Sequence, residues 1–151
     1  MSDVRMTPTS LPFLPEPLLS GVRVLVVEDE AYTLAVVQWL LEQCGAVVTP
    51  AASAGEALAS FDAVSVQSEA TDQRRFDVLV SDVGLPEQDG FELLAEVRRR
   101  VGGAGLPALA LTAYAREEDR RKAMEVGFEG YLAKPVEPRV LVETIAGMVG
   151  R

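Results

Sequence analysis

The chain has 151 residues, 48% of them hydrophobic, and a net charge of −9. This length fits one domain with an extension, and the acidic balance opposes binding to a nucleic-acid backbone. We expect no membrane insertion and no signal peptide, because no apolar run has the necessary length.

Two residue types limit the possible chemistry. Cys44 is the only cysteine, so the chain forms no disulfide within itself, which favours a reducing, cytoplasmic setting. The chain contains no histidine, which excludes His-based zinc sites, Ser-His triads and an internal phosphohistidine.

The basic runs 98–100 and 120–122 predict solvated helix faces, the first at a helix C-terminus.

The expected elements begin after a proline-rich stretch. Residues 1–20 contain four prolines and predict an extended tail or linker. Short apolar runs predict strands at 22–27, 46–49, 78–81, 108–111 and 130–133. Helical spacing or capping signals predict helices at 34–44, from 53, at 89–101, at 115–126 and at 141–148. Residues 62–75 are long and polar for a connection, and either extend the second helix or form a surface loop.

Five alternations of strand and helix predict an α/β fold with a doubly wound parallel sheet and right-handed crossovers. Polar residues follow four of the strands: Glu28 and Asp29, Asp82, Thr112, and Lys134. Because the carboxyl ends of parallel strands meet at one edge, where open α/β sheets bind ligands, we expect these groups to gather there.

The carboxylates carry the chemistry of this expected site. Asp82 can attack a phosphoryl group to form an acyl phosphate, although an aspartate at a strand end is by itself more often a cap or turn former. Glu28, Asp29 and Asp82 would crowd one volume, which a divalent cation such as Mg²⁺ relieves. An acidic loop open to solvent is the alternative for Glu28 and Asp29.

The other two strand ends suit a phosphoryl group. Lys134 can pair with a carboxylate or phosphoryl oxygen as a point charge, and its bond to Pro135 is a candidate for cis geometry. The Thr112 hydroxyl can donate to a phosphoryl oxygen, although an ordinary capping threonine is the alternative.

With these residues in view, the chain resembles the receiver domain of two-component response regulators. The resemblance rests on four motifs: Val-Val-Glu-Asp-Glu at 26–30, Ser-Asp-Val-Gly-Leu-Pro at 81–86 with Asp-Gly at 89–90, Leu-Thr-Ala at 111–113, and Tyr-Leu-Ala-Lys-Pro at 131–135. It covers roughly residues 21–149 and includes stand-alone receivers and those of hybrid histidine kinases. It implies a receiver domain at 21–151, with a flavodoxin-like five-stranded sheet in the order 2-1-3-4-5 and five flanking helices.

The resemblance also implies a mechanism. Asp82 would accept a phosphoryl group from a histidine kinase or phosphotransfer protein, with Lys134 and Thr112 on the phosphoryl oxygens. Mg²⁺ or Mn²⁺ would be held by Glu28, Asp29, Asp82 and the backbone carbonyl of Gly84. Movement of Thr112 would let Tyr131 turn inward and change the surface of the fourth helix, fifth strand and fifth helix, which would bind a downstream partner or a second copy. A plain strand aromatic is the alternative for Tyr131.

Two other functions remain open beside this signalling role, in which catalysis is limited to self-phosphorylation and autodephosphorylation. One is a receiver-like scaffold that binds partners independently of phosphate. The other is a metal-dependent aspartyl phosphatase, although Gly84 stands where such enzymes often carry a second aspartate. A nucleotide site is weaker, because the glycines at 102, 103 and 105 follow a helix rather than a strand. The initiator Met1 suggests a free-standing receiver.

Overall fold

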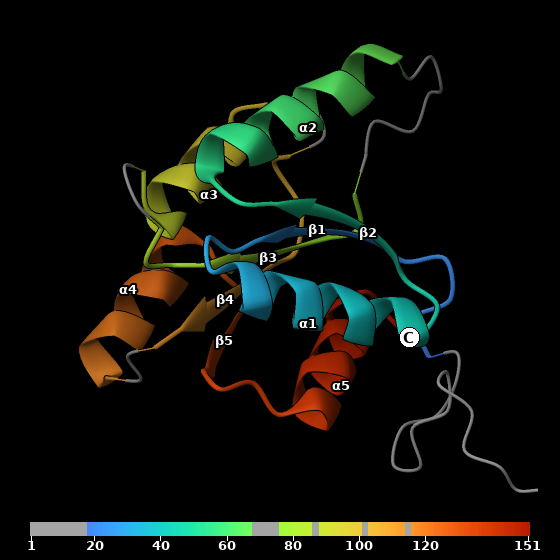
Figure 1. The fold of residues 1–151 in the computed structure, drawn as a ribbon. Coiled ribbons are helices and arrows are strands. Elements are labelled where there is room, and N and C mark those ends of the chain that lie inside the picture. Colours follow the sequence, from blue (N-terminus) through green and yellow to red (C-terminus); the bar gives the residue numbers. More distant parts are fainter. Residues whose placement is uncertain (1–17, 68–75, 86–87, 101–102, 114–115) are drawn as a thin grey trace, which may run out of the picture.

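The computed structural model describes residues 18–67, 76–85, 88–100, 103–113 and 116–151, and side chains 64–67 are not among the described parts. Its core is a parallel sheet of five strands in the order β2-β1-β3-β4-β5 (Figure 1), which confirms the flavodoxin-like fold. The strands are β1 (Arg23–Val27), β2 (Val47–Ala51), β3 (Val78–Asp82), β4 (Ala108–Thr112) and β5 (Gly130–Ala133). The helices are α1 (Ala31–Gln43), α2 (Ala54–Gln67), α3 (Gly90–Arg98), α4 (Glu117–Val126) and α5 (Pro138–Met148).

Helices cover both faces of the sheet, α1 and α5 on one and α2, α3 and α4 on the other (Figure 1). Alternate residues of one strand therefore enter different cores. Val24 and Val26 of β1 lie in the cluster with α1 and α5, whereas Leu25 and Val27 lie in the cluster with α2 and α3. This double burial explains why β1 is a continuous apolar run without alternation.

The start of the folded part differs from the expected boundary at residue 21. Leu19 is fully buried in the cluster on the α1 and α5 side, with Leu18 packed against it. The Leu19 amide donates a 2.8 Å hydrogen bond to the Cys44 carbonyl. Residues 18–20 therefore belong to the folded part, and the rest of the expected tail lies outside the described residues.

The bounds of four further elements also differ from the expected ones. β2 begins and ends later than 46–49, because its pairing with β1 runs from Arg23 beside Val47 to Val27 beside Ala51. The second helix extends through Gln67, so the start of the polar 62–75 segment is helical, and residues 68–75 lie outside the described part. α3 ends at Arg98 and α4 begins at Glu117, so both are shorter than expected.

The two helix caps expected from sequence differ in completeness. At α3 both halves of the capping box form: Asp89 accepts from the Glu92 amide at 2.9 Å, and Glu92 accepts from the Asp89 amide at 3.1 Å. At α2, Ser53 accepts from the Glu56 amide at 3.1 Å, but the Glu56 carboxylate accepts from the Ala52 amide instead. The start of α3, which follows the phospho-acceptor candidate, is thus fixed by a complete box.

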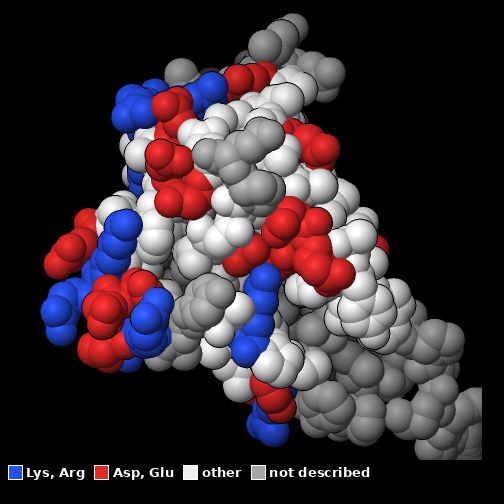
Figure 2. All heavy atoms as spheres, turned by 60° about the vertical axis from the view of Figure 1, so that its left-hand side comes forward, with Lys and Arg blue, Asp and Glu red and all other residues white. Residues whose placement is uncertain are grey.

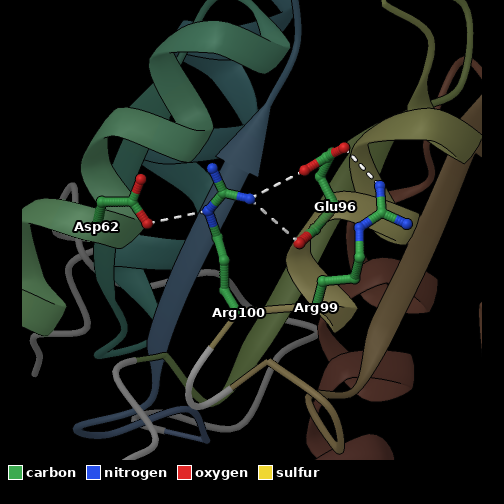
Figure 3. Close-up of polar contacts among 4 residues, drawn as sticks. All are labelled: Asp62, Glu96, Arg99 and Arg100. Atoms are coloured by element: carbon green, nitrogen blue, oxygen red, sulfur yellow. Dashed lines mark hydrogen bonds and ion pairs between the residues drawn. The ribbon is translucent and has the colours of Figure 1, made fainter.

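The basic run 98–100 is more engaged than a solvated helix face. Arg100 bridges two helices, because its guanidinium lies 2.9 Å from Asp62 of α2 and 3.0 Å from Glu96 of α3 (Figure 3). Arg98 donates to the carbonyls of Gly103 and Leu106 and, across the chain, to that of Gly127. Only Arg99, which follows α3 and pairs with Glu96 of that helix, is a solvated side chain at a helix C-terminus as expected.

The second basic run, residues 120–122, is exposed on α4 as expected. Its Lys122 lies over the ring of Phe91, with the ammonium 4.7 Å from the ring centre. None of the described helices is long and apolar enough to span a bilayer.

Candidate functional site

Three carboxylates meet at the carboxyl edge of the sheet. Glu28 and Asp29 follow β1, and Asp82 is the last residue of the neighbouring strand β3. Each residue contributes an oxygen that lies within 4.8 Å of the others. Figure 2, which brings this edge of the molecule forward, shows acidic side chains gathered on it. The structure thus brings together the carboxylates that the sequence predicted to meet.

The three carboxylates differ in exposure. Glu28 is 1% exposed and Asp82 is 6% exposed, whereas Asp29 is open to solvent. The Glu28 carboxylate also accepts from the Glu30 amide at 3.0 Å. The cluster therefore has two buried carboxylates and one that faces solvent. The alternative of an acidic loop open to solvent, which the sequence offered for Glu28 and Asp29, applies only to Asp29.

A lysine lies among these carboxylates. The Lys134 ammonium is 2.5 Å from Oε1 of Glu28 and 3.4 Å from Oδ2 of Asp82. Lys134 follows β5, donates its amide to the Thr112 carbonyl at 2.7 Å, and precedes a cis bond to Pro135. Lys134 thus brings one positive charge from the end of β5, two strands from β3, to the two buried carboxylates.

Burial and pairing act in opposite directions on this pair. Burial raises the pKa of Glu28, and the hydrogen bond from Lys134 opposes that rise. For Lys134, burial lowers the pKa, but the hydrogen bond that its ammonium donates to Glu28 and the charge of Asp82 outweigh the effect of burial, so the pKa is raised overall. The ammonium therefore stays charged at neutral pH, as a ligand for anionic oxygens must.

The donor set fits a hard divalent cation. Glu28, Asp29 and Asp82 offer carboxylate oxygens, which Mg²⁺ and Mn²⁺ prefer over nitrogen or sulfur. Gly84 is exposed, its amide donates to Oδ1 of Asp82 at 3.1 Å, and a Cβ added there would lie 3.9 Å from that oxygen, an ordinary contact. The site is therefore sterically open beside Asp82, and the Gly84 carbonyl ligand remains a prediction.

Thr112 and Tyr131 occupy different positions along their strands relative to the carboxyl edge of the sheet, where the three carboxylates lie. Thr112 ends β4, which pairs with β3 and β5, and it is 1% exposed. Tyr131 pairs with Ala110 within β5 and is half-buried against the core on the α2 and α3 side. Thr112 thus stands at the carboxyl edge of the sheet, whereas Tyr131 lies nearer the middle of its strand.

One residue had no assigned role in the sequence beyond membership of a motif. Gly90 begins α3 directly against the end of β3, and its amide donates to the Val83 carbonyl at 3.1 Å. A Cβ at Gly90 would lie 2.6 Å from the Asp82 carbonyl oxygen and 2.8 Å from Cα of Val83. The available sequence signal was the Asp-Gly pair at 89–90, whose glycine permits this close approach.

The comparison with known families agrees with this geometry. The model of the response regulator receiver domain matches residues 24–146. The chain belongs to this family. Receiver domains act as signalling modules of two-component systems, and membership of the family assigns this general role to the chain.

Relatives include a small protein and several large kinases. The chain is 44% identical over 127 residues to an uncharacterized 14.6 kDa protein in the sodA1 3′ region of Leptolyngbya boryana, which covers 84% of this receiver and 89% of that protein. It is 32% identical over 155 residues to the sensor histidine kinase GacS of Pseudomonas protegens, which covers 99% of this receiver but 16% of the kinase. The chain thus spans a small part of the kinases it matches.

Solved receiver structures share the fold. The chemotaxis response regulator CheY4 of Vibrio cholerae superposes with a TM-score of 0.75 at 32% identity, covering 85% of this receiver and 99% of that chain. The receiver of the sensor histidine kinase PA1611 of Pseudomonas aeruginosa, described with a magnesium ion coordinated in its active site cleft, gives a TM-score of 0.73 at 30% identity. It covers 87% of this receiver and 100% of that chain.

Proposed function

We propose that this receiver accepts a phosphoryl group on Asp82 from the phosphohistidine of a histidine kinase or phosphotransfer protein. One observation carries the proposal: Asp82 ends a central strand, 6% exposed, with the Lys134 ammonium 3.4 Å from its Oδ2. Such a carboxylate is held in place by the sheet and has a cation beside it that suits the incoming anionic group.

The transfer needs one bond to form and one to break. An oxygen of Asp82 bonds to phosphorus while the bond between phosphorus and the donor imidazole nitrogen breaks, and the electron pair returns to the imidazole. Lys134 neutralises charge on the phosphoryl oxygens, and the Thr112 hydroxyl donates to one of them. When bound by Glu28, Asp29, Asp82 and the Gly84 carbonyl, Mg²⁺ or Mn²⁺ would add positive charge between the carboxylates and the phosphoryl group.

The output of the proposed reaction is a change of surface. Thr112 would move toward the phosphoryl group and Tyr131 would turn inward, altering the face of α4, β5 and α5 for a downstream partner or a second copy. The packing of α4 supports this proposal, because Ala123 is its one described residue that is buried. Moving a helix that buries so few residues costs little free energy.

On this proposal the chain works in the cytoplasm, either alone or as part of a hybrid kinase. The only reactions it catalyses are its own phosphorylation and dephosphorylation. The glycine at position 84 supports the view that the chain does not hydrolyse other phosphate esters. An aspartyl phosphatase would need a carboxylate there as its second acid or base, and Gly84 has no side chain.

The test is phosphorylation by a small donor. With acetyl phosphate and Mg²⁺, intact mass measurement should show one added phosphoryl group on the wild-type chain and none on Asp82→Asn or in EDTA. Asp62→Asn, which removes an exposed carboxylate on α2, is the matched control and should be modified like wild type. If no adduct forms, beryllofluoride binding separates fast hydrolysis from a silent site, and failure of both overturns the proposal.

A further inference from the structure

The last residue of α3 connects the end of α4 to the rest of the fold. The Arg98 guanidinium donates to the Gly127 carbonyl at 2.9 Å, and Gly127 is the residue that caps the C-terminal end of α4. The same guanidinium donates to the carbonyls of Gly103 and Leu106, which precede β4. The Arg98 side chain is 22% exposed, so water competes little for these bonds. One side chain thus connects α3, the segment before β4 and the end of α4.

Two further contacts hold the same end of α4. The ring of Phe128, which is buried, packs edge-on against Phe91 of α3, with the ring centres 6.3 Å apart. The Glu129 carboxylate accepts from the Ala108 amide at 2.8 Å and lies 3.8 Å from the guanidinium of Arg98. Aromatic packing and charge-assisted hydrogen bonds therefore act together at this end of the helix.

The N-terminal half of α4 buries much less. All ten residues of α4 are described, and none of residues 117–122 is buried. The single buried residue of the helix, Ala123, lies in its C-terminal half. Local movement costs the least free energy where little apolar surface is buried. The N-terminal half of α4 can therefore move at a lower cost than the end beside Arg98.

The two ends of α4 lie at opposite edges of the sheet. The helix begins after β4, whose last residue is Thr112, and ends before β5, whose first residue is Gly130. Its N-terminus is thus on the same edge as Asp82, and the contacts of Arg98 are on the other edge. Ten helical residues span about 15 Å, so a rotation of about 10° around the C-terminal end would move the N-terminus by about 3 Å.

We propose that Arg98 is the positioning residue about which α4 pivots when Asp82 is phosphorylated. This inference rests on the phosphorylation proposed above. Arg98 keeps Gly127 against α3 in both states of the receiver, so the change of surface is confined to the N-terminal half of α4. A partner that distinguishes the two states must then contact residues 117–122, whose exposed side chains carry charges of both signs.

The test is amide hydrogen exchange of the full chain in Mg²⁺, with and without beryllofluoride, while fluorine NMR reports whether beryllofluoride is bound. In the wild type, beryllofluoride should change the exchange rate of the Arg120 amide, which donates within the first turns of α4, by about tenfold or more. The amides of Gly127 and Phe128, which close the C-terminal end of α4, should change by less than about twofold.

Arg98→Lys tests the role of the guanidinium. Lysine keeps the positive charge but lacks the planar fork that reaches three carbonyls at once. Beryllofluoride should then change exchange at Gly127 by about tenfold as well, because the end of α4 is no longer fixed. A purely stabilising role of Arg98 would raise the rates with and without beryllofluoride equally, and their ratio would stay that of wild type.

The matched control is Arg99→Lys. Arg99 is the next residue, but it pairs with Glu96 at the surface (Figure 3), so this variant should give the wild-type pattern. Bound beryllofluoride with equal changes at Arg120 and Gly127 in the wild type would overturn the pivot alone, as would a wild-type ratio in Arg98→Lys. Failure of both beryllofluoride binding and modification by acetyl phosphate would overturn the proposed function, and the pivot with it. If only acetyl phosphate acts, it replaces beryllofluoride in the same comparison.

Discussion

The ammonium nitrogen of Lys134 lies 2.5 Å from Oε1 of Glu28, whose side chain is 1% exposed. The same nitrogen is 3.4 Å from Asp82. Lys134 therefore pairs with both buried carboxylates, and its closer partner is not the proposed phosphoryl acceptor. This pairing makes the stability of the fold depend on the same charges that the proposed reaction uses.

Lys134→Met should lower the free energy of unfolding by about 2–3 kcal/mol in EDTA at neutral pH, since it leaves buried carboxylates without their cation. Urea unfolding gives the value. Added Mg²⁺ should reduce the difference from wild type, because it supplies positive charge to the same oxygens. A loss that Mg²⁺ does not change would show that the cation binds elsewhere.

The Lys134 pair also predicts a dependence on alkaline pH. The pKa of Lys134 is raised from its usual 10.5 in the folded state by Glu28 and Asp82, against the effect of burial. A raised pKa stabilises the fold fully below 10.5, and this contribution is lost as pH rises through the folded-state pKa. The stability advantage of wild type over Lys134→Met should therefore be constant around neutral pH and decline above 10.5 in urea unfolding curves.

Asp29→Asn should weaken Mg²⁺ binding about tenfold or more, because the variant loses a charged oxygen of the acidic cluster. The shift of the thermal unfolding midpoint with Mg²⁺ concentration measures the affinity. Glu30→Gln is the matched control: Glu30 is the next residue, but its carboxylate caps α1 by accepting from Thr33. Equal Mg²⁺ affinities in the two variants would contradict the assignment of Asp29.

Gly90→Ala should lower the free energy of unfolding by about 1–3 kcal/mol, because its Cβ would meet the Asp82 carbonyl oxygen and Cα of Val83. Phosphorylation by acetyl phosphate should slow as well, since α3 must move away from the end of β3. The control is Gly147→Ala in α5, where a Cβ has no neighbour within 4 Å and helix propensity improves. A neutral Gly90→Ala would refute the steric argument.

Arg98→Met should destabilise the fold by about 2–4 kcal/mol, because the carbonyls of Gly103, Leu106 and Gly127 each lose the hydrogen bond that Arg98 donates. The adjacent Arg99→Met should change stability by less than about 0.5 kcal/mol, because its pair with Glu96 is exposed. Urea midpoints of the two variants make the comparison, and similar losses would mean that charge, rather than the three carbonyl bonds, matters.

The sequence by itself determined the order of the elements and the edge of the sheet where the site lies. Buried parallel strands are visible as short apolar runs, and the crossover rule places all their carboxyl ends together. The meeting of Glu28, Asp29 and Asp82 therefore followed from the ends of two neighbouring strands. The cap at Asp89 also followed, because both of its partners lie within one turn of chain.

Only the tertiary structure decided which of several possible partners each polar group takes. Lys134 contacts Glu28 more closely than Asp82, and Arg98 reaches Gly127 far along the chain. Leu19 enters the core although prolines precede it, because α1 and α5 leave an apolar space that it fills. These choices depend on packing between distant segments, whose energies outweigh local preference and leave no periodic signal in the sequence.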